Sequence, residues 1–211
     1  DQMQITVGGG VESISLVQTP EMRVQSDPTV LKYAPDAYIA MLNTAEIVGQ
    51  RYGISRAECD EYGLISQQRT AAAYEAGAYA DELAPLVSRQ KVVDKATGEV
   101  SYKDVTLTKD EGFRPETTLE GLQGLREVIP GGIVTAGNAS QLSDGASANV
   151  LMEAKEAERR GLQPLGRYVG MAVAGVEPDE MGIGPVKAVP PLLERFGLTV
   201  DDIDLWELNE A

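Results

Sequence analysis

The chain has 211 residues, of which 43% are hydrophobic and 24% charged, a composition typical of a globular protein with one or two cores. Its formal net charge of -15 repels nucleic acids and anionic membrane surfaces, so we expect neither as a partner. No apolar run approaches the roughly 18 residues of a membrane-spanning helix, and residues 1–25 lack the order of a signal peptide, which predicts a cytoplasmic protein.

The first 53 residues contain one predicted strand and one predicted helix. Residues 4–7 have a strand-like pattern and lead into three consecutive glycines. An irregular, proline-containing excursion follows. Residues 43–51 are predicted to form a helix, with Asn43 or Thr44 as the N-cap and Gly53 at the C-terminal stop.

The next predicted elements are a long helix, a hairpin and a short helix. Ser55 and Glu58 have the spacing of a capping box and open a helix that ends at Gly77. Residues 90–108 alternate in polarity on both sides of a turn, which predicts a β-hairpin. A short helix is expected at 119–125.

A loop of small residues follows a short apolar strand at 133–134. It carries Asn138 and Ser140 among alanines and glycines. Such a loop lets a ligand approach the backbone closely, with a few polar groups to orient it. A tight strand-to-helix turn has the same composition, and the residues alone favour neither interpretation.

The C-terminal third alternates between helices and strands. Ser143 or Asp144 is expected to cap the first helix. The predicted elements are a helix at 144–160, a strand at 168–176, a helix at 186–196 and a strand at 204–208. This alternation predicts an α/β protein.

Histidine and cysteine usage excludes several kinds of chemistry. The chain has no histidine and one cysteine, Cys59, so it contains no Ser-His or Cys-His pair, no internal disulfide and no ordinary zinc site. The carboxylates of Glu58 and Asp60 disfavour a reactive thiolate, and we interpret Cys59 as a packing or surface residue. We expect no metal site and no redox cofactor.

Several motifs give the chain a resemblance to one family over essentially its whole length. In order they are GGGVESIS, MLNTAE, TTLEGL, VTAGNASQLSDGASA, MGIGPV and ELNEA. Their order and spacing resemble those of thiolases, the acetyl-CoA C-acyltransferases. The resemblance implies thiolytic cleavage of a 3-ketoacyl-CoA, or the reverse Claisen condensation, with coenzyme A as a substrate and no separate cofactor.

The resemblance also implies a fold and its boundaries. Thiolases have a five-layered α-β-α-β-α core of two similar halves, with a large α+β loop domain inserted in the first half and covering the coenzyme A. On this chain, residues 1–14 would end a strand of the first half, 15–142 would form the loop domain, 143–163 would return to the first half, and 164–211 would begin the second. The chain would therefore cover only part of the fold.

The final segment, residues 204–211, is matched to the Asn-Glu-Ala motif of thiolases. There the asparagine holds a water that helps to form an oxyanion hole, which makes Asn209 the candidate catalytic residue. The family nucleophile, a cysteine, would lie before Asp1, and the family histidine and second cysteine after Ala211. The 211 residues alone are therefore expected to be inactive.

The remaining site residues implied by the resemblance contact the substrate. Ser140 would bind the pantetheine beside Ala136, and the planar Arg114 guanidinium would pack on the adenine. The candidate substrate- and coenzyme A-binding residues are Met41, Arg114, Ala136, Ser140, Met181 and Ala211. Bacterial biosynthetic thiolases often carry His-Met-Gly where this chain has Ala40-Met41-Leu42, which keeps a broader 3-ketoacyl-CoA specificity open beside the short-chain one.

Two other interpretations are compatible with these residues. One is a non-catalytic acyl-CoA-binding or lipid-carrier protein, or an inactive truncated domain, on the same fold. The other is a related condensing enzyme such as a ketoacyl synthase, in which GNASQLSDGA followed by Asn-Glu-Ala is not expected. Thiolases assemble as dimers or tetramers, so the resemblance also implies a homodimer or homotetramer.

Overall fold

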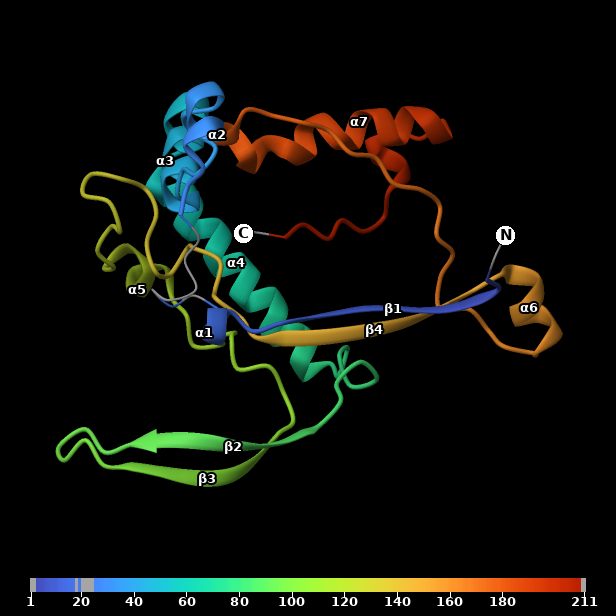
Figure 1. The fold of residues 1–211 in the computed structure, drawn as a ribbon, viewed down its shortest axis with the longest axis horizontal. Coiled ribbons are helices and arrows are strands. Elements are labelled where there is room, and N and C mark those ends of the chain that lie inside the picture. The colour runs from blue at the N-terminus through green and yellow to red at the C-terminus, as the bar shows by residue number, and fades with distance from the viewer. Residues whose placement is uncertain (1–2, 18, 20–24, 210–211) are drawn as a thin grey trace. The chain divides into compact units, whose positions relative to one another are not determined.

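The computed structural model describes residues 3–17, 19 and 25–209 (Figure 1). The chain divides into two compact units. The first contains residues 1–54 and 140–211, and the second contains residues 55–139. Within the described residues, none of the helices is long and apolar enough to cross a membrane.

The first unit is built on a two-stranded antiparallel sheet of β1 (Ile5–Glu12) and β4 (Gly145–Met152) (Figure 1). Strand β1 continues through the three glycines that follow the predicted strand. A Cβ atom at Gly9 would lie only 2.5 Å from the carbonyl oxygen of Ser147 on β4. The two backbones can approach this closely only because that position of β1 has no side chain.

The prediction of a helix at 144–160 is wrong over most of its length. Residues 145–152 form β4, and only α6 (Ala154–Arg159) is helical. The apolar residues of this stretch fit a helical face and a short strand equally well. The antiparallel partner β1, more than 130 residues earlier in the chain, decides the outcome because its backbone completes the hydrogen bonds of β4.

The other elements of the first unit are helical. Helix α3 (Met41–Tyr52) begins two residues before the prediction, with Ala40 as its N-cap instead of Asn43 or Thr44. It ends at Gly53, whose φ of 68° is left-handed, as the glycine there predicts. The remaining helices are α1 (Ile14–Val17), α2 (Pro28–Tyr33), the 3₁₀ helix η2 (Pro178–Ile183), α7 (Gly184–Phe196) and the 3₁₀ helix η3 (Val200–Asp202).

Two predicted strands in the C-terminal segment are not formed. Residues 168–176 and 204–208 do not form strands in the structure. Both segments have the composition of strands, but a strand also needs a hydrogen-bonded neighbour, and neither segment pairs with β1 or β4. Part of the first segment packs against α7 instead, since a Cβ atom at Gly170 would lie 2.4 Å from the Phe196 ring.

The second unit contains the long helix α4 (Arg56–Glu75), the hairpin of β2 (Leu86–Val93) and β3 (Val100–Leu107), and α5 (Leu119–Gln123). The predicted capping box of α4 is present: the Ser55 N–H donates to Glu58 Oε2 at 2.7 Å, and the Glu58 N–H donates to Ser55 Oγ at 3.3 Å. The hydrogen bond from Ser55 lowers the pKa of Glu58. The predicted hairpin is also confirmed, with Val93 opposite Val100 next to the turn.

The most deeply buried part of the second unit lies between α4, α5 and the segment 133–139. Leu122 on α5 and Val134 are buried apolar residues there. Asp60 and Thr135 are completely buried polar residues in the same region. The centre of this unit is therefore partly polar, and its buried groups must be paired by hydrogen bonds.

Candidate functional site

One side of α4 receives the two segments that carry Arg114 and Ala136. Five residues of α4 follow one another at intervals of three, four or seven positions. Viewed down the helix axis, these five positions lie within an arc of about 60°. They are Arg56, Asp60, Gly63, Gln67 and Tyr74. We call this set the docking face of α4.

The segment 133–139 is fixed by hydrogen bonds of its own side chains. Asn138 Oδ1 accepts from the Thr135 N–H at 2.8 Å, and Asn138 Nδ2 donates to the Ile133 carbonyl at 3.0 Å. Thr135 Oγ1 accepts from the Gly137 N–H at 3.2 Å. These bonds close a tight turn whose exposed residue is Ala136.

Asn138 also joins this turn to the docking face. Its Nδ2 donates to Asp60 Oδ1 at 2.9 Å, and Asp60 Oδ2 accepts from Arg56 Nε at 2.7 Å. Arg56 Nη2 donates in turn to the carbonyls of Leu122 and Leu125 at 2.8 Å and 3.1 Å. A buried carboxylate is tolerated when it is paired in this way.

Two glycines make the close packing of the turn possible. A Cβ atom at Gly137 would lie 2.5 Å from both Leu122 Cδ2 and Leu125 Cδ1. A Cβ atom at Gly63 on α4 would lie 3.4 Å from the Gly137 carbonyl oxygen. Gly137 thus serves the packing of a tight turn, while Ala136 and Ser140 remain exposed and accessible to a ligand.

The turn does not lead into a helix cap as the sequence indicated. Asp144 immediately precedes β4, and its Oδ1 accepts from the Ser15 N–H at 2.9 Å. This hydrogen bond lowers the pKa of Asp144. Asp144 therefore fixes the segment before β4 to the start of α1 in the first unit.

Arg114 is held against the docking face through its backbone. Its N–H donates to Gln67 Oε1 at 2.7 Å, and its carbonyl accepts from Thr117 Oγ1 at 2.7 Å. The residue itself is exposed. Because Gly63 and Gln67 are one turn apart, about 6 Å along α4, the structure brings the segments of Arg114 and Ala136 to neighbouring positions on one helix face.

Tyr74 anchors the same segment further along α4. Its ring stacks on Phe113 with the ring centroids 4.4 Å apart and an interplanar angle of 12°. The hydroxyl of Tyr74 donates to the Asp110 carboxylate and accepts from the Asp110 N–H at 3.1 Å. The hydrogen bond to Asp110 raises the pKa of Tyr74.

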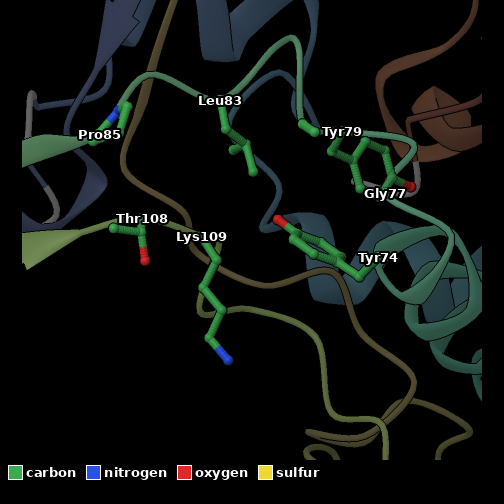
Figure 2. Close-up of a pocket in the computed structure, with 8 residues that line it drawn as sticks. Tyr74, Gly77, Tyr79, Leu83, Pro85, Thr108 and Lys109 are labelled. Carbon is green, nitrogen blue, oxygen red and sulfur yellow. The ribbon is translucent and has the colours of Figure 1, made fainter.

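A pocket that sequence reasoning did not predict lies at the end of α4 (Figure 2). Its volume is about 320 Å³. Figure 2 shows the Tyr74 hydroxyl and the Leu83 side chain turned toward its interior. The lining residues are Tyr74, Gly77, Tyr79, Ala80, Leu83, Pro85, Thr108 and Lys109.

The two candidate methionines lie on elements of the first unit that pack together. Met41 is the first residue of α3, and Met181 lies within η2. Helix η2 packs against the C-terminal end of α3. There Arg51 of α3 forms ion pairs with Asp179 and with Glu180, and its Nη1 lies 2.8 Å from Glu180 Oε1. Met41 is about 15 Å from Arg51 along the axis of α3, at the opposite end of that helix.

The other predicted site residues lie in the first unit or outside the described residues. Ser140 directly follows the turn and is exposed. Asn209 is exposed and lies in a segment without regular secondary structure. Ala211 lies outside the described residues.

Sequence reasoning missed Asp60 and Arg56. Their spacing of four residues on a predicted helix is the signal that could have indicated an ion pair. The link to Asn138 has no local signal, because 78 residues separate Asn138 from Asp60.

The comparisons with known proteins identify the family. The profile described as "Thiolase, N-terminal domain" matches residues 1–155, and "Thiolase, C-terminal domain" matches residues 162–211. The chain therefore belongs to the thiolase family.

Two curated relatives have similar sequences. The chain is 44% identical over 204 residues to 3-ketoacyl-CoA thiolase B, peroxisomal, of Rattus norvegicus, covering 96% of the chain and 47% of the relative. It is 41% identical over 209 residues to 3-ketoacyl-CoA thiolase of Bacillus subtilis (strain 168), covering 97% of the chain and 52% of the relative. The chain spans about half the length of the curated relatives it matches.

Solved structures show the thiolase fold. Human mitochondrial 3-ketoacyl-CoA thiolase in complex with CoA matches with a TM-score of 0.79 at 37% identity, over 99% of this chain and 52% of the human chain. The dimeric peroxisomal thiolase of Saccharomyces cerevisiae matches with a TM-score of 0.83 at 34% identity, over 100% of this chain and 51% of the yeast chain. The expected fold class is confirmed, and the chain covers about half of it.

Proposed function

We propose that the natural protein containing these residues is a thiolase that cleaves 3-ketoacyl-CoA. The observation that carries the proposal is the match of nearly the whole chain, at 41% and 44% identity, to two relatives named 3-ketoacyl-CoA thiolase. In the proposed reaction, a cysteine thiolate attacks the ketone of 3-ketoacyl-CoA, and the carbon–carbon bond between the acyl group and the acetyl-CoA part breaks. The acyl group stays on the cysteine as a thioester, while the acetyl-CoA enolate takes a proton from a general acid and leaves as acetyl-CoA. The thiolate of a second coenzyme A then attacks the acyl-enzyme thioester, which regenerates the cysteine thiolate and gives a shortened acyl-CoA.

The roles of individual residues are part of the same proposal. Asn209 would hold the water that stabilises the developing oxyanion. Arg114, Ala136 and Ser140 would contact coenzyme A, with Ala211 nearby, and Met41 and Met181 would line the acyl and pantetheine channel. The nucleophile and base would come from outside these 211 residues, because the chain has no histidine and Cys59 does not match a family cysteine.

We also propose the partners and the location of the natural protein. The human relative is described in complex with CoA and the yeast relative as dimeric, which supports coenzyme A binding and a homodimer or homotetramer here. The relatives' names include peroxisomal and mitochondrial proteins, so a cytoplasmic location stays a prediction.

The proposed chemistry needs neither a metal nor a redox cofactor, because thioester exchange and carbon–carbon cleavage here involve no net oxidation. Full activity after dialysis against EDTA is the expected result. Loss of activity that added Zn²⁺ or Mg²⁺ restores would contradict it.

The function is tested by thiolysis of acetoacetyl-CoA and of a longer 3-ketoacyl-CoA by the natural protein. Wild-type protein should turn over at least one of them, and Asn209→Ala should lower kcat by about 100- to 1000-fold, the usual effect of losing one oxyanion donor. Asn149→Ala, at an exposed position of β4, is the matched control and should retain wild-type kcat. Coenzyme A binding without turnover of either substrate would instead identify the non-catalytic alternative.

A further inference from the structure

Asp60 is a completely buried carboxylate with no part in the proposed chemistry. Both of its oxygens are used: Oδ1 accepts from Asn138 Nδ2 and Oδ2 accepts from Arg56 Nε. Through Arg56 the same carboxylate is connected to the carbonyls of Leu122 and Leu125 at the end of α5. One side chain therefore links α4, α5 and the turn that presents Ala136.

The chemistry of the carboxylate determines how Asn138 is oriented. An ionised carboxylate can only accept hydrogen bonds, so Asn138 must turn Nδ2 toward Asp60. The amide oxygen then faces the opposite way, where it accepts from the Thr135 N–H at 2.8 Å. If the amide were reversed, its oxygen would face the Asp60 carboxylate and its NH₂ group would face the Thr135 N–H, and both bonds would be lost.

This orientation in turn fixes the shape of the turn. The hydrogen bond that the Thr135 N–H donates to Asn138 Oδ1 spans three residues and encloses Ala136 and Gly137. The bond from Asn138 Nδ2 to the Ile133 carbonyl ties the turn to the residues before it. Ala136 is the exposed residue of the enclosed pair, so its position at the surface depends on Asn138 and, through Asn138, on Asp60.

A purely packing role does not require this arrangement. Apolar side chains of similar volume can hold two helices together at least as well as a buried ion pair. Unlike apolar side chains, the ion pair and the amide require each hydrogen bond to run in one direction only, from a fixed donor to a fixed acceptor.

We infer that Asp60 is a positioning residue for coenzyme A binding, which acts by fixing the amide of Asn138 and thereby the turn of Ala136. This inference rests on the proposed function. It assigns to Asp60 no contact with the substrate.

The first test is Asp60→Asn in the natural protein. The asparagine has one acceptor where two donors converge, so its NH₂ group must face either Arg56 Nε or Asn138 Nδ2. The KM for coenzyme A in thiolysis should rise about tenfold, the equivalent of one lost charge-assisted hydrogen bond, while kcat stays within about threefold. Asp81→Asn is the matched control, because Asp81 is exposed, and it should leave both constants unchanged.

A second variant covers the case in which Asp60→Asn does not fold. Asn138→Ala keeps the ion pair of Asp60 with Arg56 but removes the bond to Asp60 together with the two bonds that close the turn, so KM should rise by at least the same factor. Glu156→Gln is the control for stability. It removes the negative charge and one of the two acceptor oxygens that face Arg159 and Arg160 at α6, and it should lower the melting temperature without changing KM.

Each outcome decides a different point. A raised KM in Asp60→Asn, with kcat nearly retained, supports the inference. A raised KM in Asn138→Ala beside an unchanged KM in Asp60→Asn means that the turn matters without Asp60, and the inference is wrong. An unchanged KM in both variants, whatever happens to kcat, means that Asp60 only stabilises the fold and also overturns it. If wild-type protein shows no turnover, the proposed function fails. Calorimetric titration with coenzyme A then tests the positioning role of Asp60 separately. Equal affinity of wild type and variants for coenzyme A, or no binding at all, overturns the inference about Asp60.

Discussion

Replacing Gly137 by alanine should destabilise the second unit, although a glycine-to-alanine change often has the opposite effect. The added Cβ atom would lie 2.5 Å from both Leu122 Cδ2 and Leu125 Cδ1, compared with an ordinary carbon–carbon contact of about 3.5–4.0 Å. Leu122 is only 5% exposed, so it has little room to move. Overpacking of this kind costs about 1–3 kcal/mol.

Two terms combine in the expected magnitude. The φ of Gly137 is not positive, so alanine fits the backbone there, and the reduced freedom of the unfolded chain contributes about 0.4–1 kcal/mol of stabilisation. Taken at the middle of both ranges, the net effect is a loss of about 1.3 kcal/mol of unfolding free energy. Gly124→Ala is the matched control, because a Cβ atom there meets nothing closer than 3.5 Å and should be neutral or slightly stabilising.

Peptide-resolved hydrogen exchange of the natural protein measures this local effect directly. Under conditions in which exchange follows the opening equilibrium, peptides covering residues 119–139 should exchange about 5- to 30-fold faster in Gly137→Ala. Peptides from β1 and β4 serve as the internal reference. Exchange at the wild-type rate, or an equal acceleration in Gly124→Ala, would refute the reasoning from the clash.

Three further outcomes follow from local contacts. Ser55→Ala removes the side-chain cap of α4 and should lower the unfolding free energy by about 1 kcal/mol, measured by urea unfolding; an unchanged urea midpoint would contradict the cap. Arg159 and then Arg160 lower the pKa of Glu156 to about 2. The stabilising contribution of Glu156 is therefore present above its ordinary pKa near 4.5 and is lost as the pH falls toward 2. The difference in melting temperature between wild type and Glu156→Gln should then shrink between pH 5 and pH 2.5. A constant difference would count against the ion pairs. Raising KCl from 0.05 to 0.5 M should lower the melting temperature of wild type more than that of Arg51→Met, because the paired Arg51 is partly exposed to screening ions. Equal shifts in melting temperature would show that the ion pairs of Arg51 with Asp179 and Glu180 do not contribute to stability.

The elements that the sequence predicted correctly have local signals. The capping box at Ser55 and the turn of the hairpin lie within a few residues of the structure they specify. The left-handed Gly53 likewise follows directly from the end of α3. Such signals need no knowledge of distant residues, and for that reason they could be interpreted from one sequence.

The elements that the sequence did not predict depend on partners far along the chain. Strand β4 is a strand because β1 pairs with it, and residues 204–208 lack such a partner in the structure. The docking face of α4 could not be predicted either, because hydrophobic periodicity reveals only apolar helix faces. The first three turns of this face carry Arg56, Asp60, Gly63 and Gln67, none of which is a large apolar residue. The predicted boundaries at 14, 142 and 163 stay a prediction.

The hydrogen bond between Asn138 and Asp60 also bears on how the second unit folds. The residues of the hairpin are adjacent in sequence, and hairpins of this kind form within about 1–10 μs. Asn138 can reach Asp60 only after a loop of 78 residues has closed, and long loops close at an entropic cost before their contacts form. If this bond forms after the rate-limiting step, weakening it accelerates unfolding and leaves the folding rate almost unchanged. The lifetime of the folded unit would then depend on Asp60, while the speed of its formation would depend on the hairpin and α4.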